Sequence, residues 1–145
     1  MQYFKDKVAV VTGAASGIGR GMAEVFKAKR SGVEGFEKVV ALKRILPHLS
    51  ENKEFLDMFV DEAKMVAGLT HPNIVQVFDV GRFRNLFVIA MEYVPGEALR
   101  TVLKRRGRFP WPEALRLMNG VLRGVEHAHD EGIIHRDLKP NNVIL

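Results

Sequence analysis

The sequence predicts an α+β fold in which an antiparallel sheet packs against one helix and a small helical segment follows. The strand-like apolar runs that predict the sheet are residues 39–43, 74–78 and 86–91. A helical period of apolar residues separates the first run from the second and covers residues 51 to about 69. After Pro95-Gly96 the pattern is helical, first over residues 97–105 and then over 113–130.

Two further strands are expected near the N-terminus. The apolar run at residues 7–11 is expected to form the first strand of the sheet, and residues 22–29 are expected to form the second. Residues 20–30 also contain Met, Ala, Glu and Lys, which favour a helix, so a helix there is the alternative. Residues 79–85 are expected to be the turn that joins the last two strands.

Capping residues predict where the first helix begins. Ser50 is the expected N-cap, and Glu51 and Glu54 would stand in the first turn, where the helix dipole favours acids. One side of the predicted helix then carries a stripe of residues at steps of four and three: Phe55, Phe59, Glu62, Val66 and Leu69. All of them except Glu62 are apolar. Gly68 and His71-Pro72 are typical of a helix end.

Glu62 is a charged residue within the apolar stripe of this helix. A buried carboxylate needs a cationic or hydrogen-bonding partner. Lys43, at the end of the preceding strand, is the candidate partner, and such a lysine is well placed to meet phosphate oxygens. The alternative is that the helix is slightly rotated and that Glu62 is solvated at the edge of the stripe.

Composition limits the classes of function. The chain has 145 residues, a net charge of +5 and no cysteine, which excludes disulfides, thiolate metal sites and a thiol nucleophile. No apolar run is long enough to span a bilayer, so no membrane segment is expected, and the lack of cysteine fits the cytoplasm. The basic cluster at residues 104–108 is expected to be a solvated helix end and not a nucleic-acid-binding patch.

Four motifs resemble those of bacterial serine/threonine protein kinases over residues 22–145. The motifs are V-A-L-K at 40–43, H-P-N-I-V at 71–75, M-E-Y-V at 91–94 and H-R-D-L-K-P-N-N-V-I-L at 135–145. The resemblance implies a kinase-like N-lobe over residues 27–94 and the first helices of the C-lobe over 95–145. It also implies ATP and Mg²⁺ as cofactors and a protein as the substrate.

The resemblance implies roles for particular residues. Asp137 would accept or orient the proton of the substrate hydroxyl, Lys139 would stabilise the transferred phosphoryl group, and Asn142 would bind Mg²⁺. Lys43 would contact the α- and β-phosphates and pair with Glu62. The residues implied in ATP binding are Gly17, Gly19, Gly21, Val25, Ala41, Lys43, Met91, Glu92 and Val94.

The glycine loop departs from the kinase pattern G-x-G-x-x-G-x-V. When the pattern starts at Gly17, Gly19 fits but Met22 replaces the third glycine. When it starts at Gly19, Gly21 fits but Val25 comes one residue early. The loop therefore looks one glycine short, and such a deletion either reverses the direction of the side chains that follow or is absorbed by the turn.

Residues 5–26 resemble a second family. The segment T-G-A-A-S-G-I-G at residues 12–19 is similar to the cofactor loop of short-chain dehydrogenases, where backbone N–H groups bind the pyrophosphate of a dinucleotide. The Tyr-x-x-x-Lys pair of that family does not follow the loop, because the tyrosines are Tyr3 and Tyr93. The resemblance is therefore limited to the loop and its preceding strand.

These two resemblances predict a composite chain. Residues 1–26 would be a dehydrogenase-like strand and glycine-rich turn, and we hypothesise a junction between two genes within residues 19–26. A dinucleotide-binding fragment and a non-catalytic interaction domain are the alternative functions. The intact set of Lys43, Asp137 and Asn142 argues against the interaction domain.

The kinase pattern ends with its catalytic loop. The Asp-Phe-Gly motif, which supplies another Mg²⁺ ligand in kinases, does not follow Asn142 in this sequence. We expect no useful kinase activity from the 145 residues alone, because phosphoryl transfer depends on charge neutralisation. The apolar side of the helix at 113–130 would also lack its usual partners, and its exposure would favour self-association or a partner. This side consists of Leu115, Met118, Leu122, Val125 and His129.

Overall fold

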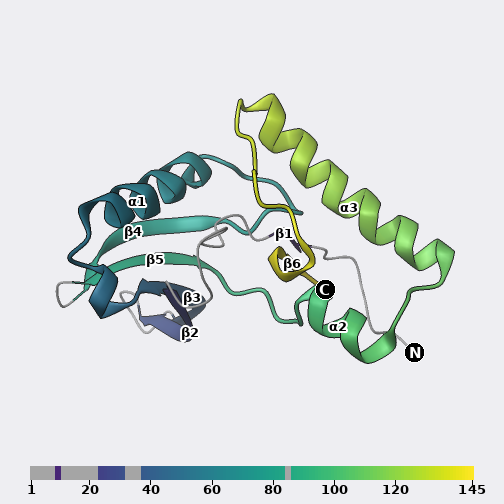
Figure 1. Cartoon of the computed structure of the whole chain (residues 1–145), viewed down its shortest axis with the longest axis horizontal. Coiled ribbons are helices and arrows are strands. Elements are labelled where there is room, and N and C mark those ends of the chain that lie inside the picture. The colour runs from purple at the N-terminus through teal and green to yellow at the C-terminus, as the bar shows by residue number, and fades with distance from the viewer. Residues whose placement is uncertain (1–8, 11–22, 32–36, 84–85) are drawn as a thin grey trace. The chain divides into compact units, whose positions relative to one another are not determined.

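The computed structural model describes residues 9–10, 23–31, 37–83 and 86–145 (Figure 1). The chain divides into two compact units. The first, here called the sheet unit, comprises residues 15–68 and 76–93. The second, here called the helical unit, comprises residues 1–14, 69–75 and 94–145.

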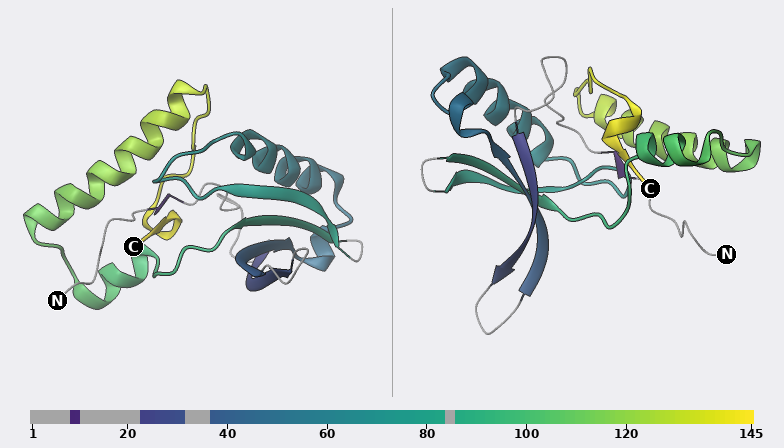
Figure 2. Two further views of the ribbon diagram at one scale, coloured as in Figure 1. Left: turned by 180° about the vertical axis from the view of Figure 1, so that it is seen from behind. Right: turned by 60° about the horizontal axis from the view of Figure 1, so that its bottom comes forward.

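The sheet unit contains a four-stranded antiparallel sheet in the order β2-β3-β5-β4. Its strands are β2 (Ala23–Ser31), β3 (Glu37–Ile45), β4 (Val77–Phe83) and β5 (Leu86–Glu92). The right panel of Figure 2 shows β2 and β3 as a long twisted ribbon. The strand predicted at 22–29 is confirmed, and the helical alternative for 20–30 is wrong, because pairing with β3 along its whole length outweighs local helix propensity.

Helix α1 (Lys53–Ala67) packs against β4, and apolar side chains of α1 and the sheet form the core of this unit. The buried core residues are Val40, Ala41, Ile45, Phe59, Ala63, Val66, Ile89 and Met91. Phe59 and Val66 belong to the predicted apolar stripe of the helix, and both are buried. Ala63, which the predicted stripe does not include, is buried between them.

The start of α1 differs from the prediction. Its N-cap is Asn52, whose Oδ1 accepts hydrogen bonds from the backbone N–H groups of Glu54 (3.0 Å) and Phe55 (3.3 Å). Ser50 instead ends the short 3-10 helix η2 (Pro47–Leu49), and its hydroxyl donates to the carbonyl of Pro47. The proline begins a separate turn that engages Ser50, so the cap moves to the next suitable polar residue, Asn52.

Replacement of Asn52 by alanine is expected to lower the free energy of unfolding by about 1 kcal/mol, because two helix N–H groups lose their acceptor. Urea denaturation followed by circular dichroism measures the loss. Asn52→Asp is the control, and it should retain the stability because aspartate caps equally well. Equal losses in both variants would show that the cap is not the stabilising feature.

The β4–β5 hairpin is longer than predicted. The turn predicted at 79–85 is largely strand, because the pairing continues to Phe83 opposite Leu86. A bulge makes this possible: Val77 pairs with Met91, but Asp79 pairs with Ala90, so one extra residue is absorbed in β4. The strand predicted at 74–78 therefore begins three residues late, at Val77.

The helical unit contains α2 (Leu99–Arg106), α3 (Trp111–Asp130), the 3-10 helix η3 (Pro140–Asn142) and a two-stranded sheet. The helices predicted at 97–105 and 113–130 are confirmed within two residues. No helix among the described residues is long and apolar enough to cross a membrane.

The two-stranded sheet corrects one prediction. Residues 7–11 were expected to start the main sheet, but β1 (Ala9–Val10) pairs antiparallel with β6 (Val143–Ile144) in the helical unit. Ala9 faces Ile144 and Val10 faces Val143, and α3 contacts β1. The partner of β1 is therefore the short strand that directly follows η3, and not a strand of the four-stranded sheet.

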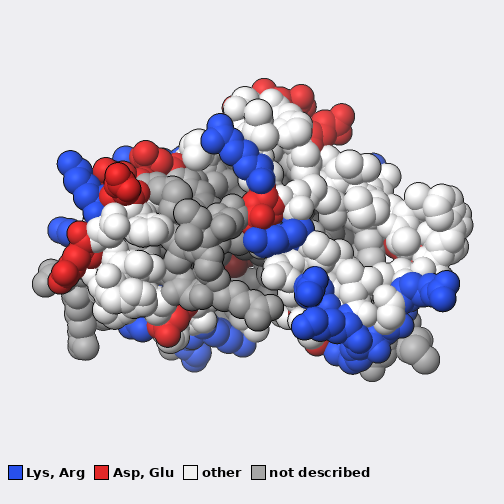
Figure 3. Space-filling model, viewed as in Figure 1, with Lys and Arg blue, Asp and Glu red and all other residues white. Residues whose placement is uncertain are grey.

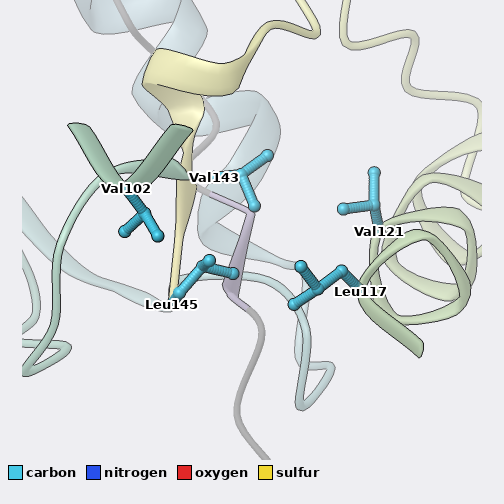
Figure 4. Close-up of a cluster of buried hydrophobic side chains, with 5 residues drawn as sticks. All are labelled: Val102, Leu117, Val121, Val143 and Leu145. Carbon is cyan, nitrogen blue, oxygen red and sulfur yellow. The ribbon is translucent and has the colours of Figure 1, made fainter. Parts of the chain in front are cut away.

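The core of the helical unit gathers side chains from α2, α3 and the last three residues (Figure 4). Its buried members are Val102, Leu117, Val121, Val143 and Leu145, and Leu99, Phe109 and Val125 pack around them. Leu145 and Glu97 exchange two backbone hydrogen bonds of 3.0 and 3.1 Å. A Cβ atom on Gly96 would lie 2.1 Å from the carbonyl oxygen of Leu145, so only glycine fits beside this pairing.

Helix α3 has two apolar faces. The buried face consists of Leu117, Val121, Gly124 and Ala128. The face predicted from the sequence is the other one, and the expected exposure is confirmed at Leu115, Met118 and Leu122, whereas Val125 is half-buried. The sequence pattern shows two overlapping apolar stripes, and only the tertiary contacts decide which of them is covered.

Gly124 allows a loop to approach α3 closely. A Cβ atom at this position would lie 3.1 Å from the carbonyl oxygen of Asn73, in the segment 71–75. On the same helix, the ring of His127 stacks on that of His71, with centroids 5.0 Å apart. Burial lowers the pKa of His71, as do the charges of His127 and Arg123. The H-P-N-I-V motif therefore packs within the helical unit.

Candidate active site

The loop between α3 and β6 folds back on itself at Arg136. Arg136 has a φ of 57°, a left-handed conformation that is uncommon for a residue with a side chain. The backbone N–H of Asp137 donates to the carbonyl of His135 at 2.8 Å and also to His135 Nδ1 at 3.2 Å. The tight turn fixes the direction of the Asp137 side chain.

Three of the predicted catalytic residues meet in this loop. Lys139 Nζ lies 2.7 Å from Oδ2 of Asp137. The Asn142 side chain donates from Nδ2 to the same Oδ2 at 3.0 Å and to the carbonyl of Asp137 at 2.8 Å. Asn142 is only 3% exposed, so its amide is held firmly. Both hydrogen bonds are donated by Nδ2, so neither of them uses the side-chain oxygen.

Asp137 is poised to carry a negative charge. Burial alone would raise the pKa of its carboxyl group, but hydrogen bonds from Lys139 and Asn142 and the charges of Lys139 and His135 outweigh burial and lower this pKa. The carboxylate is therefore ionised at neutral pH, and one of its oxygens already holds two donors. Such a carboxylate can accept a hydrogen bond from a hydroxyl group and orient it.

Replacement of Lys139 by methionine is expected to raise the pKa of Asp137 towards its usual range, because a hydrogen bond and a positive charge are lost. A carboxylate NMR titration measures this, with the exposed Lys104→Met as the control that leaves the pKa unchanged.

The lowered pKa of Asp137 also makes the stability of the fold depend on pH. The folded-state pKa of Asp137 lies below the unfolded-state value, so its ionised form stabilises the fold above the unfolded-state pKa. This contribution is lost as the pH falls through the folded-state pKa, and the Lys139→Met variant should lose part of it at neutral pH. An unchanged pKa in that variant would contradict the proposed role of the ion pair.

His135 has one nitrogen without a partner in the described part of the chain. Its Nδ1 accepts the hydrogen bond from the backbone N–H of Asp137, so Nε2 is the ring nitrogen left for another partner. This Nε2 is buried and has no hydrogen-bond partner among the described residues. Buried polar atoms are rarely left unpaired, so this nitrogen is an exception among the described residues.

The other two predicted catalytic residues, Lys43 and Glu62, lie in the sheet unit. Lys43 on β3 is 7% exposed, and its Nζ lies 5.5 Å from the ring centroid of Phe59 on α1. Glu62 belongs to α1, but its side chain lies outside the described part, so its predicted ion pair with Lys43 stays a prediction. A buried lysine on a central strand needs polar partners, which makes Lys43 a functional candidate.

Several predicted ATP-binding residues are brought together by strand pairing. Ala41 on β3 stands opposite Met91 on β5, and both side chains are buried. Val25 on β2 stands opposite Lys43 and is exposed. The backbone N–H of Glu92 donates to the carbonyl of Gln76 at 2.8 Å.

The remaining predicted ATP-binding residues lie in the helical unit or outside the described residues. Val94 is half-buried and begins the last segment of the helical unit. Gly17, Gly19 and Gly21 lie outside the described residues, as does most of the dehydrogenase-like segment 5–26.

The residues present suit a magnesium ion that is shared with a phosphate ligand. Among the described residues, no three His, Asp or Glu side chains gather as a metal cage. Mg²⁺ does not require one, because it is usually held by one or two protein oxygens together with substrate phosphates and water. The side-chain oxygen of Asn142, the residue predicted to bind the metal, is a group of this oxygen type.

Sequence reasoning missed two features of the loop. The left-handed backbone of Arg136 has no signal in the sequence, because such conformations usually fall on Gly, Asn or Asp. The hydrogen bond from Asn142 to Asp137 was also missed, although their spacing of five residues around Pro140 permits a tight loop.

Residues 14–145 match the family model described as "Protein kinase domain". Among curated proteins, "Tyrosine-protein kinase MasK" of Myxococcus xanthus is 42% identical in an alignment 137 residues long, and the match covers 86% of this chain and 21% of that protein. "Serine/threonine-protein kinase PrkC" of Bacillus subtilis is 35% identical over 127 residues, which are 88% of this chain and 19% of that protein. The chain thus spans about a fifth of the length of these relatives.

Solved structures indicate the same family as the sequence comparisons. A crystal structure of the PknI kinase domain of Mycobacterium tuberculosis superposes with a TM-score of 0.70 at 34% identity, covering 86% of this chain and 49% of that chain. The match to the family model includes residues 14–26, so the kinase match accounts for most of the glycine-rich segment. The resemblance of residues 5–26 to dehydrogenases is not supported.

Proposed function

Because this chain belongs to the protein kinase domain family, we propose that it supplies the Mg²⁺- and ATP-binding residues and the catalytic loop of a kinase for protein serine and threonine hydroxyls. The observation that carries the proposal is the position of Asp137, whose carboxylate is held by Lys139 and Asn142 in an ionised state. A scaffold has no physical need for this combination.

The residues of the loop would divide the chemistry as follows. Asp137 would accept a hydrogen bond from the substrate hydroxyl and orient its oxygen for attack on the γ-phosphorus of ATP. Lys139, already beside Asp137, would stabilise negative charge on the transferred phosphoryl group. Mg²⁺ bound with ATP would neutralise phosphate charge, and the side-chain oxygen of Asn142 would be one of its ligands.

The roles proposed for Lys43 and Glu62 rest on their sequence motif and on the burial of Lys43. Lys43 would contact the phosphates of ATP, and Glu62 would hold its ammonium group in place. The backbone between Met91 and Val94 would bind the adenine edge. Lys139 favours serine and threonine over tyrosine as the acceptor, and relatives carrying either name are found.

Thermal unfolding with nucleotides tests the proposal. Mg²⁺ with ATP is expected to raise the melting temperature, because a ligand that binds only the folded state stabilises it. NADH is the matched control for the rejected dinucleotide function, and it should have no effect. Stabilisation by NADH, or by neither compound, would contradict the proposed function.

A further inference from the structure

A lysine of β2 contacts the residue that directly follows β5. The ammonium group of Lys27 lies over the ring of Tyr93, 4.4 Å from the ring centroid. Lys27 is exposed and Tyr93 is half-buried. At this distance an ammonium group is attracted to the negative face of an aromatic ring. Because β5 ends at Glu92, the contact ties β2 to the first residue after β5.

The strand register places Lys27 in one row with two residues of the predicted ATP site. Lys27 stands opposite Ala41 on β3, and Ala41 stands opposite Met91 on β5. Residues that stand directly opposite each other lie on the same face of a sheet. Lys43, two residues after Ala41, lies on this face as well. Lys27 therefore belongs to the face of the sheet that carries the predicted ATP-binding side chains.

The contact between Lys27 and Tyr93 crosses a whole strand. β3 lies between β2 and β5. Neighbouring strands are about 4.8 Å apart, so β2 and β5 are about 10 Å apart. The residue of β3 at the crossing is Ala41, whose single methyl group leaves room for a lysine stem. Lys27 can reach Tyr93 because the residue between them is small.

The charge of Lys27 is not neutralised by an acid. In the part of the chain that the structure describes, Lys27 takes part in no ion pair. The cations of α2 are different: Figure 3 shows blue side chains gathered over this helix, and Arg105 and Arg106 each pair with a glutamate there. The ammonium group of Lys27 is thus held by an aromatic ring instead of a carboxylate.

The same sheet contains a similar contact on its other face. Lys38 on β3 lies over the ring of Phe78 on β4, 3.9 Å from the ring centroid. Successive residues of a strand point to opposite faces, so Lys38, three residues before Ala41, lies on the face opposite to the predicted ATP site. The two contacts have the same chemistry and differ in the face that they occupy. Lys38 is therefore a matched control for Lys27.

We propose that Lys27 is a positioning residue for the base of ATP. By holding the ring of Tyr93, it fixes the backbone that follows Met91, where the adenine edge would bind. This role rests on the proposed function, in which Lys43 on the same face contacts the phosphates. The two lysines then act on different parts of the nucleotide, Lys27 on the base and Lys43 on the phosphates.

Isothermal titration of the full chain with adenosine, and with ATP and Mg²⁺, separates these two roles. Lys27→Met should weaken the binding of both ligands by the same factor, about three- to tenfold, because it removes a cation–π contact. Lys43→Met should weaken the binding of ATP alone, because adenosine has no phosphate. Lys38→Met should bind both ligands as the wild type does.

Two further variants test whether Lys27 acts through Tyr93. Lys27→Arg should retain the affinity for adenosine, because a guanidinium group also stacks on an aromatic ring. Tyr93→Leu should weaken adenosine binding as Lys27→Met does. The double variant should bind no more weakly than either single variant, because both substitutions remove the same contact. Circular dichroism checks that each variant is folded.

Four outcomes would overturn the inference. They are an unchanged affinity for adenosine in Lys27→Met, a loss that is confined to ATP, an equal loss in Lys38→Met, and losses that add in the double variant. In each of these cases a wild type that binds ATP with Mg²⁺ leaves the proposed function intact. A wild type that binds neither ligand would overturn the proposed function and this inference with it.

Discussion

Replacement of Leu117 by alanine is expected to lower the free energy of unfolding by about 2–5 kcal/mol, the range found when a buried leucine leaves a cavity. Leu117 is 8% exposed and packs in the core with Val102, Val121, Val143 and Leu145. Denaturant unfolding at low protein concentration, followed by circular dichroism, measures the change.

Leu115→Ala is the matched control. It makes the same substitution in the same helix two residues earlier, where the side chain is 48% exposed. An exposed position of this kind usually changes the free energy of unfolding by less than about 0.5 kcal/mol. Equal losses in the two variants would show that the buried face of α3 is assigned wrongly.

Replacement of Asp137 by asparagine is expected to lower kcat by about 10²–10⁴-fold in a protein that contains this sequence and transfers phosphate. Asparagine keeps the shape of the side chain but loses the negative charge that orients the hydroxyl and pairs with Lys139. The affinity for ATP should change little, because Asp137 is proposed to act on the hydroxyl. The rate at which the labelled γ-phosphoryl group of ATP is transferred to protein, measured over a range of ATP concentrations, gives kcat and the KM for ATP.

Asp130→Asn is the control for this substitution. Asp130 is an exposed carboxylate at the end of α3, and its replacement should leave kcat unchanged. The labelled residues should be phosphoserine and phosphothreonine. A fully active Asp137→Asn variant, or label on tyrosine alone, would contradict the proposed chemistry.

Much of the fold could be predicted because local signals agree with tertiary structure. Apolar runs predicted β3 and β5, and helical periods predicted α1, α2 and α3 with small errors at their ends. The catalytic loop was identified from the resemblance of residues 135–145 to the kinase motif, in which Asp137, Lys139 and Asn142 each have a chemical task. Chemistry constrains such residues more tightly than packing constrains the residues around them.

The errors share a physical origin. The N-cap moved to Asn52 because Pro47 begins an independent turn, and β4 lengthened because a bulge absorbed a residue after Val77. Likewise, β1 pairs with β6 because strand partners are chosen by contacts distant in sequence. No local sequence pattern predicts the cap, the bulge or the strand pairing, and none predicts which apolar face of α3 is buried.

Isothermal titration tests the claim that the chain binds ATP with Mg²⁺ through the kinase residues. Lys43→Met should weaken the binding of ATP with Mg²⁺ by about 10–100-fold, because it removes a charge-assisted contact to phosphate. Lys38→Met, on the same strand but exposed, should bind as the wild type does. Equal affinities in all three proteins, or binding that does not depend on Mg²⁺, would contradict the claim.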